Sequence, residues 1–209
     1  MMIVGLTGSI AMGKTTAANH LKSRGIPVFD SDAAVHALYE GEAVERIEQA
    51  FPGVVQDGRV DRQRLGAAIA GSPEALAKLE AIVHPMVRAK QRDFLLAEHA
   101  RGTRLAVLDI PLLYESGADA LVDAVIVISA PEEVQRQRLA ARRGMTPEKI
   151  SDLLGRQMPD AEKRARADFL VDSSGPIPAT QAQLDRIIAK LQAREGEKIA
   201  VWREMDAAS

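Results

Sequence analysis

The chain contains no cysteine, and this absence excludes several kinds of site. Without a thiol, the protein forms no disulfide bond, no thiolate zinc site and no cysteine nucleophile. Aromatic residues are also scarce, at 3% of the 209 residues. Surfaces that stack unpaired bases need such residues, so their scarcity argues against binding of single-stranded nucleic acid. A chain without cysteine suits a reducing compartment, and we expect a cytoplasmic protein.

Charge of one sign and long apolar runs are absent too. The chain has 27 Lys and Arg residues against 29 Asp and Glu residues, a formal net charge of −2. No overall field therefore attracts nucleic acid or a membrane surface. No apolar run approaches the roughly 18 residues of a spanning helix, and the N-terminus lacks a basic-then-apolar leader. We expect no nucleic-acid partner, no membrane partner, and a monomer.

A phosphate-loop motif is present near the N-terminus. Residues 8–15, Gly-Ser-Ile-Ala-Met-Gly-Lys-Thr, match G-x-x-x-x-G-K-[ST] at every fixed position. An apolar run over residues 2–6 predicts a buried strand before the loop, and a helix follows it, which disfavours a chance match in a glycine-rich turn. Backbone N–H groups at such a helix start bind phosphate. We predict that Lys14 contacts the β- and γ-phosphates and that Thr15 coordinates Mg²⁺. The predicted ATP-binding residues here are Gly8, Ala11, Met12, Gly13, Lys14, Thr15 and Thr16.

The rest of the chain alternates strands with helices. Further strands are predicted at residues 28–30, 105–109, 122–128 and 167–171. This alternation is typical of a parallel, doubly wound sheet in an α/β fold. A final amphipathic helix is expected over residues 184–193, with a fraying polar tail after Glu195.

Residues 41–103 show helical spacing, with a turn signal at Asp57-Gly58 and a break where His84 and Pro85 interrupt the pattern before a helix over 86–100. The stretch is too long for a plain crossover, so we predict an inserted helical subdomain. The expected plan is a single three-layer phosphate-loop domain. Its core comprises residues 1–40, 104–135 and 167–209, its acceptor-binding insert residues 41–103, and its arginine-bearing lid residues 136–166.

Two carboxylates are predicted at the carboxyl ends of strands, the edge where ligands bind in open α/β sheets. Asp32 follows the strand at 28–30 and is a candidate general base for an acceptor hydroxyl. Asp30 and Asp32 are alternatively N-caps of the next helix. Asp109 ends another strand and is a candidate member of the Mg²⁺ shell; a solvated strand end is the alternative.

Basic residues cluster between residues 136 and 166, in a set that includes Arg156. Most of this cluster is expected to be a solvated basic face. Arg138 and Arg142 are four residues apart in a helix predicted from Pro131 to about Arg143, so they share one face. We expect Arg142, and Arg138 after it, to contact phosphate from a closing lid.

A phosphate loop identifies a nucleotide but not a reaction. A guanine-binding Asn-Lys-x-Asp segment is absent, because the only asparagine is Asn19. Asp109 is followed by Ile110 and Pro111 instead of the glutamate that commonly activates water in ATP-driven machines. These observations favour a kinase. His84 precedes Pro85 and follows an apolar stretch, and its spacing favours a buried histidine over a substrate contact.

Taken together, these residues resemble dephospho-coenzyme A kinase, in an ordered set of segments that runs through nearly the whole chain. The segments are residues 5–10 with the phosphate loop, 29–32 (Phe-Asp-Ser-Asp), 58–62 (Gly-Arg-Val-Asp-Arg), 83–85 (Val-His-Pro), 109–115 (Asp-Ile-Pro-Leu-Leu-Tyr-Glu), 156–157 (Arg-Gln), 162–164 (Glu-Lys-Arg) and 167–172 (Ala-Asp-Phe-Leu-Val-Asp).

The resemblance implies ATP- and Mg²⁺-dependent transfer of a phosphoryl group to the ribose 3′-hydroxyl of dephospho-coenzyme A. It implies that Asp32 is the base, that the insert holds the acceptor, and that a lid follows Arg138. It places Arg62, His84 and Pro85 at the acceptor, and Ser174 and Gly175 near the adenine of ATP.

The sequence departs from the family pattern at two positions. Ala11 stands where the family usually has glycine, and a positive φ there would cost alanine roughly 1 kcal/mol. Ser173 stands where the family commonly has asparagine, so the adenine contact is assigned to Ser174 and Gly175. Two other functions stay open: a different small-molecule kinase, for example of nucleoside monophosphates, or a nucleotide-binding regulator without catalysis, which only Ala11 supports.

Overall fold

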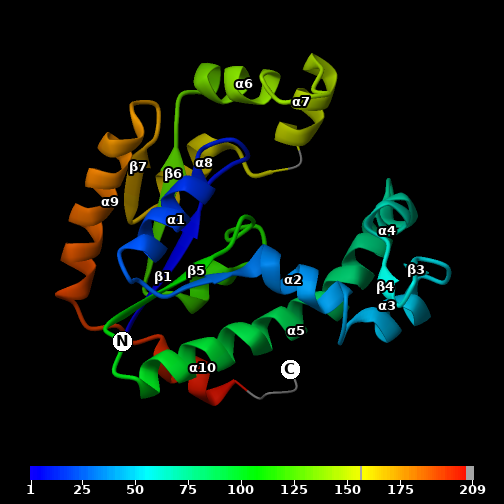
Figure 1. The fold of residues 1–209 in the computed structure, drawn as a ribbon, viewed down its shortest axis with the longest axis horizontal. Helices are drawn as coiled ribbons and strands as arrows, with labels where there is room; N and C mark the ends of the chain where they lie inside the picture. Colours follow the sequence, from blue (N-terminus) through cyan, green and yellow to red (C-terminus); the bar gives the residue numbers. More distant parts are fainter. Residues whose placement is uncertain (156, 206–209) are drawn as a thin grey trace. The chain divides into compact units, whose positions relative to one another are not determined.

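A computed structural model describes residues 1–155 and 157–205. Arg156 of the predicted basic cluster and residues 206–209 of the predicted core lie outside the described residues. The chain divides into two compact units (Figure 1). We call residues 1–29 and 95–204 the sheet unit and residues 30–94 the helical unit. The division into core, insert and lid stays a prediction.

The sheet unit is built on five strands in the order β2-β5-β1-β6-β7. The pairs β1–β5, β1–β6 and β6–β7 are parallel, which confirms the predicted parallel α/β sheet. Since β1 is central and is flanked by later strands on both sides, the loop that follows it lies at the switch point where such sheets bind ligands. The strands are β1 (Met2–Thr7), β2 (Val28–Asp30), β5 (Leu105–Asp109), β6 (Ala124–Ser129) and β7 (Phe169–Asp172).

Helices α1 (Lys14–Ser23) and α9 (Ile177–Gln192) cover one face of the sheet (Figure 1). Apolar side chains of α9 recur at helical spacing and pack with those of the strands in one buried cluster. The predicted start of this helix at Leu184 is too late. The helix begins at Ile177 because proline is tolerated in the first helical turn, where its missing N–H has no partner to lose.

Part of the tail after Glu195 forms a helix, contrary to the expectation that this tail frays. Helix α10 (Ile199–Glu204) contains Trp202, which is fully buried and donates its indole N–H to the Leu121 carbonyl at 2.8 Å, beside the short 3₁₀ helix η1 (Ala118–Leu121). Burial of the Ile199 and Trp202 side chains together stabilises this short helix.

The helical unit contains α2 (Ser31–Tyr39), α3 (Val44–Ala50), α4 (Arg62–Ile69) and most of α5 (Pro73–Ala100). It also contains a hairpin of β3 (Val55–Gln56) and β4 (Arg59–Val60) that was not predicted. Asp57 and Gly58 form its turn with φ of 49° and 76°. Asp-Gly with two positive φ angles is the preferred two-residue hairpin connection.

The prediction that His84 and Pro85 interrupt a helix is wrong, because α5 runs through both. Leu79, Val83 and Val87 recur every four residues and are buried in the apolar cluster of the helical unit. Proline in a helix interior costs about 3 kcal/mol, whereas burial of each large apolar side chain contributes about 1.5–3 kcal/mol. Packing on both sides of Pro85 therefore outweighs the local preference.

Helix α6 (Glu132–Ala140) is shorter than predicted, so Arg138 and Arg142 do not share a helix face. Arg142 lies in a tight turn after the helix, and its N–H bonds to the Leu139 carbonyl at 3.0 Å. Gly144, with a φ of 78°, closes this turn. Helices α7 (Pro147–Gly155) and α8 (Asp160–Arg166) follow. In the part of the chain described, no helix combines the length and apolar character needed to cross a bilayer.

Candidate active site

The phosphate loop connects the carboxyl end of β1 to the first residue of α1. Gly13 caps α1 with a φ of 88°, a left-handed conformation that favours glycine. Gly8 lies against β6, where an added Cβ would be 2.5 Å from the Ile128 carbonyl oxygen. Ala11 also has a positive φ, 63°, so this position carries the strain expected of alanine there. The first N–H groups of a helix have no partner within it, and those of α1 start at Lys14.

Side chains hold three consecutive carbonyl groups of the loop. Gln135 Nε2 donates to the Ile10 oxygen at 2.8 Å. The Arg138 guanidinium donates to the Ala11 oxygen at 3.3 Å, and Ser173 Oγ donates to the Met12 oxygen at 2.7 Å. In a trans peptide the N–H points opposite to the carbonyl. Fixing the Ile10 and Met12 oxygens therefore turns the N–H groups of Ala11 and Gly13 the opposite way, where an anion can accept from them. The Met12 N–H instead donates to the Ser9 carbonyl at 3.1 Å.

Lys14 and Asp109 form an ion pair in the loop, with Nζ 2.5 Å from Oδ1. Both side chains are largely buried, 16% and 5% exposed. Asp109 ends β5 and Leu6 of β1 lies beside it in register, which brings the carboxylate to the loop. Thr15 and Thr16, by contrast, are exposed in the first turn of α1. The structure thus brings the lysine, the hydroxyl-bearing helix start and one predicted metal ligand together.

Arg138 lies against the loop instead of on an open face. Besides Ala11, its guanidinium donates to Ser173 Oγ at 3.2 Å and to the Ser173 carbonyl at 2.5 Å. Ser173 is buried, so the residue at this position holds the loop and Arg138 in place. Ser174 and Gly175 follow and are exposed. Arg142 is exposed as well, in the turn after α6.

Asp172 sets the conformation of the segment assigned to adenine. Its carboxylate accepts the Ser174 N–H at 2.8 Å. Hydrogen bonds from the Ser174 backbone and hydroxyl stabilise the charged form, and so they lower the pKa of Asp172. The ionised carboxylate thus fixes the start of the exposed loop before α9.

Asp30 and Asp32 are both candidate helix caps and Asp32 is also a candidate general base, and their positions in the helical unit differ. Asp30 is the N-cap of α2, since its carboxylate accepts the Ala33 N–H at 3.0 Å. Asp32 lies in the first turn of α2, is exposed, and has no hydrogen-bond partner within the described ranges. The capping alternative therefore applies to Asp30. The catalytic role of Asp32 stays a prediction.

The residues assigned to the acceptor lie on α4 and α5 of the helical unit. Arg62 begins α4, is exposed, and has its guanidinium 2.6 Å from His36 Nε2 of α2. His84 is exposed on α5, so the expectation from its spacing that it is buried is wrong. Helix α5 continues through His84, which places it on the solvent side, away from the buried Val83 and Val87. Pro85 is half-buried.

Sequence reasoning missed a group of polar residues that support the site. Lys163 of α8 is fully buried with its Nζ 2.8 Å from Glu115 Oε1. Burial alone would raise the pKa of Glu115, but the Lys163 ammonium and the Met158 N–H together lower it. Gln135 is also buried, and Gln157 accepts the Ile10 N–H at 3.0 Å. For Glu115, Gln157 and Lys163 the signal available was their place in the resembling segments 109–115, 156–157 and 162–164, whereas Gln135 lies in none of these segments.

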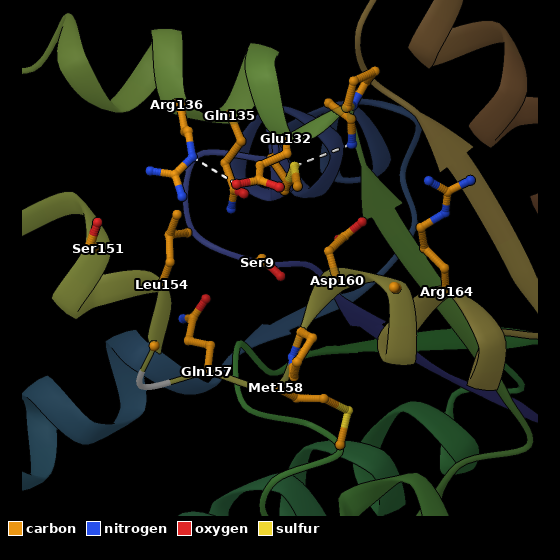
Figure 2. A pocket seen from close by; sticks show the side chains of 16 residues that line it. Ser9, Glu132, Gln135, Arg136, Ser151, Leu154, Gln157, Met158, Asp160 and Arg164 are labelled. Carbon is orange, nitrogen blue, oxygen red and sulfur yellow. Dashed lines mark hydrogen bonds and ion pairs between the residues drawn. The ribbon is translucent and has the colours of Figure 1, made fainter. Parts of the chain in front are cut away.

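A cavity of about 540 Å³ lies between the loop and helices α6, α7 and α8. Figure 2 shows Gln135, Gln157, Ser9 and Asp160 around it. Ser9 Oγ is buried there without a hydrogen-bond partner in the described part of the chain. Among all residues that the structure describes, no three His, Asp or Glu side chains form a cluster that could hold a metal ion by itself. An ion at this site would need oxygen ligands from a nucleotide as well.

Comparisons with known proteins give the family and the fold. The family model for dephospho-CoA kinase matches residues 2–179. A dephospho-CoA kinase of Rhodopseudomonas palustris is 52% identical over 189 residues, which cover 90% of this chain and 95% of that protein. The crystal structure of TT1252 from Thermus thermophilus, 36% identical, has a TM-score of 0.78 over 91% of this chain and 97% of that one. Dephospho-CoA kinase from Campylobacter jejuni, 24% identical, shares the fold with a TM-score of 0.62, covering 92% and 98%.

Proposed function

Because the chain belongs to the dephospho-CoA kinase family, we propose that it phosphorylates the ribose 3′-hydroxyl of dephospho-coenzyme A with ATP, giving coenzyme A and ADP. The new bond joins the 3′-oxygen to the γ-phosphorus, and the bond from that phosphorus to the β–γ bridging oxygen breaks. The match to the family over residues 2–179 carries the choice of acceptor. The observation that carries the use of ATP is the phosphate loop, whose carbonyls accept hydrogen bonds from side chains and whose last residues include Lys14.

The loop and Lys14 bind and orient the triphosphate. Backbone N–H groups at the start of α1 donate hydrogen bonds to oxygens of the β-phosphate, and the Lys14 ammonium reaches the β- and γ-phosphates. Lys14 already lies against Asp109, so its side chain is held in the site before the nucleotide arrives. Fixed donors of this kind stabilise the charge that develops in the transition state.

Thr15 and Asp109 would hold Mg²⁺ together with phosphate oxygens of ATP. A hydroxyl and a carboxylate are hard oxygen ligands of the kind that Mg²⁺ prefers, and Mg²⁺ is usually bound by one or two protein groups plus substrate phosphates. When bound, the ion neutralises charge on the phosphates. The fit rests on the position of Thr15 in the exposed first turn of α1 and of Asp109 at the end of β5.

Asp32 accepts the proton of the acceptor hydroxyl in this proposal, and Arg62, His84 and Pro85 of the helical unit bind the acceptor. The Asp32 carboxylate is exposed in the first turn of α2 and has no hydrogen-bond partner among the described residues, because Asp30 supplies the cap. Arg138 and Arg142 contact the phosphates from residues 136–166, and Ser174 and Gly175 contact the adenine. These assignments combine the resemblance with exposure and position.

The experiment measures ATP consumption by the purified protein with Mg²⁺, with and without dephospho-coenzyme A, and the mass of the product. We expect acceptor-dependent turnover and a product heavier by one phosphoryl group, with a 3′-specific assay locating it. AMP is the comparison acceptor. Transfer to AMP but not to dephospho-coenzyme A would favour another small-molecule kinase. ATP binding without transfer to either would favour a regulator.

A cytoplasmic location and a monomeric state belong to the same proposal. ATP-dependent biosynthesis needs an intracellular supply of ATP. Sedimentation of the purified chain at assay concentration checks the monomer, for which we expect a mass near the 22.6 kDa of the chain.

A further inference from the structure

Two glutamines hold the backbone of the phosphate loop at one residue. Gln135 of α6 donates from Nε2 to the Ile10 carbonyl at 2.8 Å, and Gln157 accepts the Ile10 N–H at its Oε1 at 3.0 Å. We propose that Gln135 and Gln157 are positioning residues for the triphosphate and that they link residues 136–155 to the loop. The proposal rests on the proposed function only in taking ATP as the ligand of the loop.

The two bonds fix the peptide planes on both sides of Ile10. Gln135 holds the carbonyl of the peptide that joins Ile10 to Ala11, so the N–H of Ala11 points the opposite way. Ala11 then adopts a φ of 63°, which L-residues rarely do without support from their surroundings. Gln157 binds the preceding N–H, which is therefore not available to phosphate. Together the two glutamines orient the N–H groups of Ile10 and Ala11, and they leave that of Ala11 to face the nucleotide.

The amide orientations are set by their partners. A carbonyl oxygen accepts only from a donor, so the Ile10 oxygen requires Nε2 of Gln135. An N–H requires an acceptor, so it faces Oε1 of Gln157. Gln135 is 4% exposed, so losing its partner would leave a buried polar group unsatisfied. Because Gln135 is buried, water does not replace its hydrogen bond to the Ile10 carbonyl.

The glutamines flank the segment predicted to be the lid. Gln135 lies in the first half of α6, and Gln157 lies between α7 and α8, with α7 in the chain between them. Figure 2 shows both residues approaching the loop at the wall of one cavity, with Ser9 of the loop beside them. A change in the position of this segment therefore acts on the loop directly. By linkage, phosphate on the loop favours one arrangement of the segment to the same extent.

The test uses the variants Gln135→Met, Gln157→Met and the double variant, since methionine keeps the length of the side chain without the amide. Gln137→Met, at an exposed position of the same helix, is the matched control. Titration calorimetry with Mg²⁺ and without acceptor measures the Kd of ATP and, separately, of adenosine. Turnover gives the KM of ATP and of dephospho-coenzyme A, and the ligand-free Tm reports folding.

Each single variant should weaken ATP binding about five- to tenfold, as expected for one lost hydrogen bond to a loop group. Adenosine binding and the KM of dephospho-coenzyme A should stay within about twofold, and the control should match the wild type. The double variant should lose less than the product of the two single effects, because the second glutamine then holds a loop already released.

An unchanged ATP Kd in both single variants would overturn the proposal, as would an equal loss of ATP and adenosine binding, which marks a purely structural role. Gln157→Met keeps the test valid should Gln135→Met lower the Tm, since Gln157 is only half-buried. If the wild type binds ATP but leaves dephospho-coenzyme A unmodified, the proposed function fails while this inference is still decided by the ATP titrations. If the wild type binds no ATP, both fail.

Discussion

The phosphate loop of the sheet unit and the residues proposed to bind the acceptor in the helical unit present their functional groups in different ways. The loop offers backbone N–H groups, and buried or half-buried side chains from α6, the α7–α8 segment and the residue after β7 hold it in place. The helical unit offers exposed side chains, Asp32, Arg62 and His84, on helices whose buried faces form a separate apolar cluster. Loop chemistry therefore depends on packing, whereas acceptor chemistry depends on single side chains. Substitutions should separate the two.

The largest effect should come from Lys14, the one charged side chain that the loop adds to its backbone groups. Lys14→Ala removes a fixed cation from the triphosphate and leaves the buried Asp109 carboxylate without this partner. We expect kcat/KM to fall by about 10³ or more, which corresponds to several kcal/mol of transition-state stabilisation. Steady-state turnover measures it. Lys22→Ala, on the exposed side of the same helix, is the control, and near-normal turnover of Lys14→Ala would contradict the role of the loop.

A second comparison contrasts one ion pair from each unit. Glu115 and the fully buried Lys163 pair in the sheet unit, whereas Glu42 and Lys90 pair at 2.6 Å on the surface of the helical unit. Glu115→Gln leaves a buried ammonium uncompensated, so the free energy of unfolding should fall by about 3 kcal/mol at pH 7. Glu42→Gln should change it by less than about 1 kcal/mol. Denaturant unfolding measures both.

The pH dependence of the first effect follows from the lowered pKa of Glu115. The pair contributes its stability above the unfolded pKa of glutamate, about 4.3, and loses it as the pH falls through the lower folded value. The difference between wild type and Glu115→Gln should therefore be full at pH 7 and shrink progressively below about pH 4. A difference that stays constant down to pH 3 would contradict the pairing.

Asp32 and Asp30 sharpen the contrast within one turn of helix. Asp32→Ala should lower the rate by a factor of about a hundred or more, as for a lost general base, with ATP affinity unchanged. Asp30→Ala should do the reverse: it removes the α2 cap and about 1 kcal/mol of stability, and turnover should persist. Single-turnover kinetics and thermal unfolding of both variants decide. An unaffected rate in Asp32→Ala would leave the acceptor hydroxyl without its proposed base.

The same contrast explains how far the sequence could be interpreted. The loop was predictable because its backbone conformation favours glycine and its phosphate contact needs a cation, which together give glycine and lysine at fixed spacing. The position of Asp109 was predictable as the end of a strand, and that of Asp32 as two residues after one. Gln135 and Gln157 were not, because a hydrogen bond to a backbone atom leaves no requirement on the type of the partner residue.

Tertiary packing accounts for the errors in the elements. Helix α5 continues through Pro85 because apolar side chains on both sides are buried. Helix α10 forms because Ile199 and Trp202 are buried. Arg142 does not share a helix face with Arg138, because α6 ends at Ala140. The last residue of a helix is poorly predicted from local sequence propensity.

The smallest predicted change in stability comes from replacing alanine with glycine once in each unit. Ala11→Gly relieves a left-handed residue, worth about 1–2 kcal/mol, and adds the unfolded-chain entropy of glycine, about 0.5–1 kcal/mol. The variant should therefore be more stable by about 0.5–1 kcal/mol, with ATP affinity equal or better, because the loop is already held by its carbonyls. Ala37→Gly, at an exposed position inside α2, should be less stable by about 1 kcal/mol, since no strain is relieved there. If the backbone of the loop is strained at Ala11, thermal unfolding should give Tm shifts of opposite sign for the two variants. A lower Tm in both variants would mean that Ala11 adopts its conformation without strain. The hydrogen bonds to the Ile10, Ala11 and Met12 carbonyls would then support ATP binding alone.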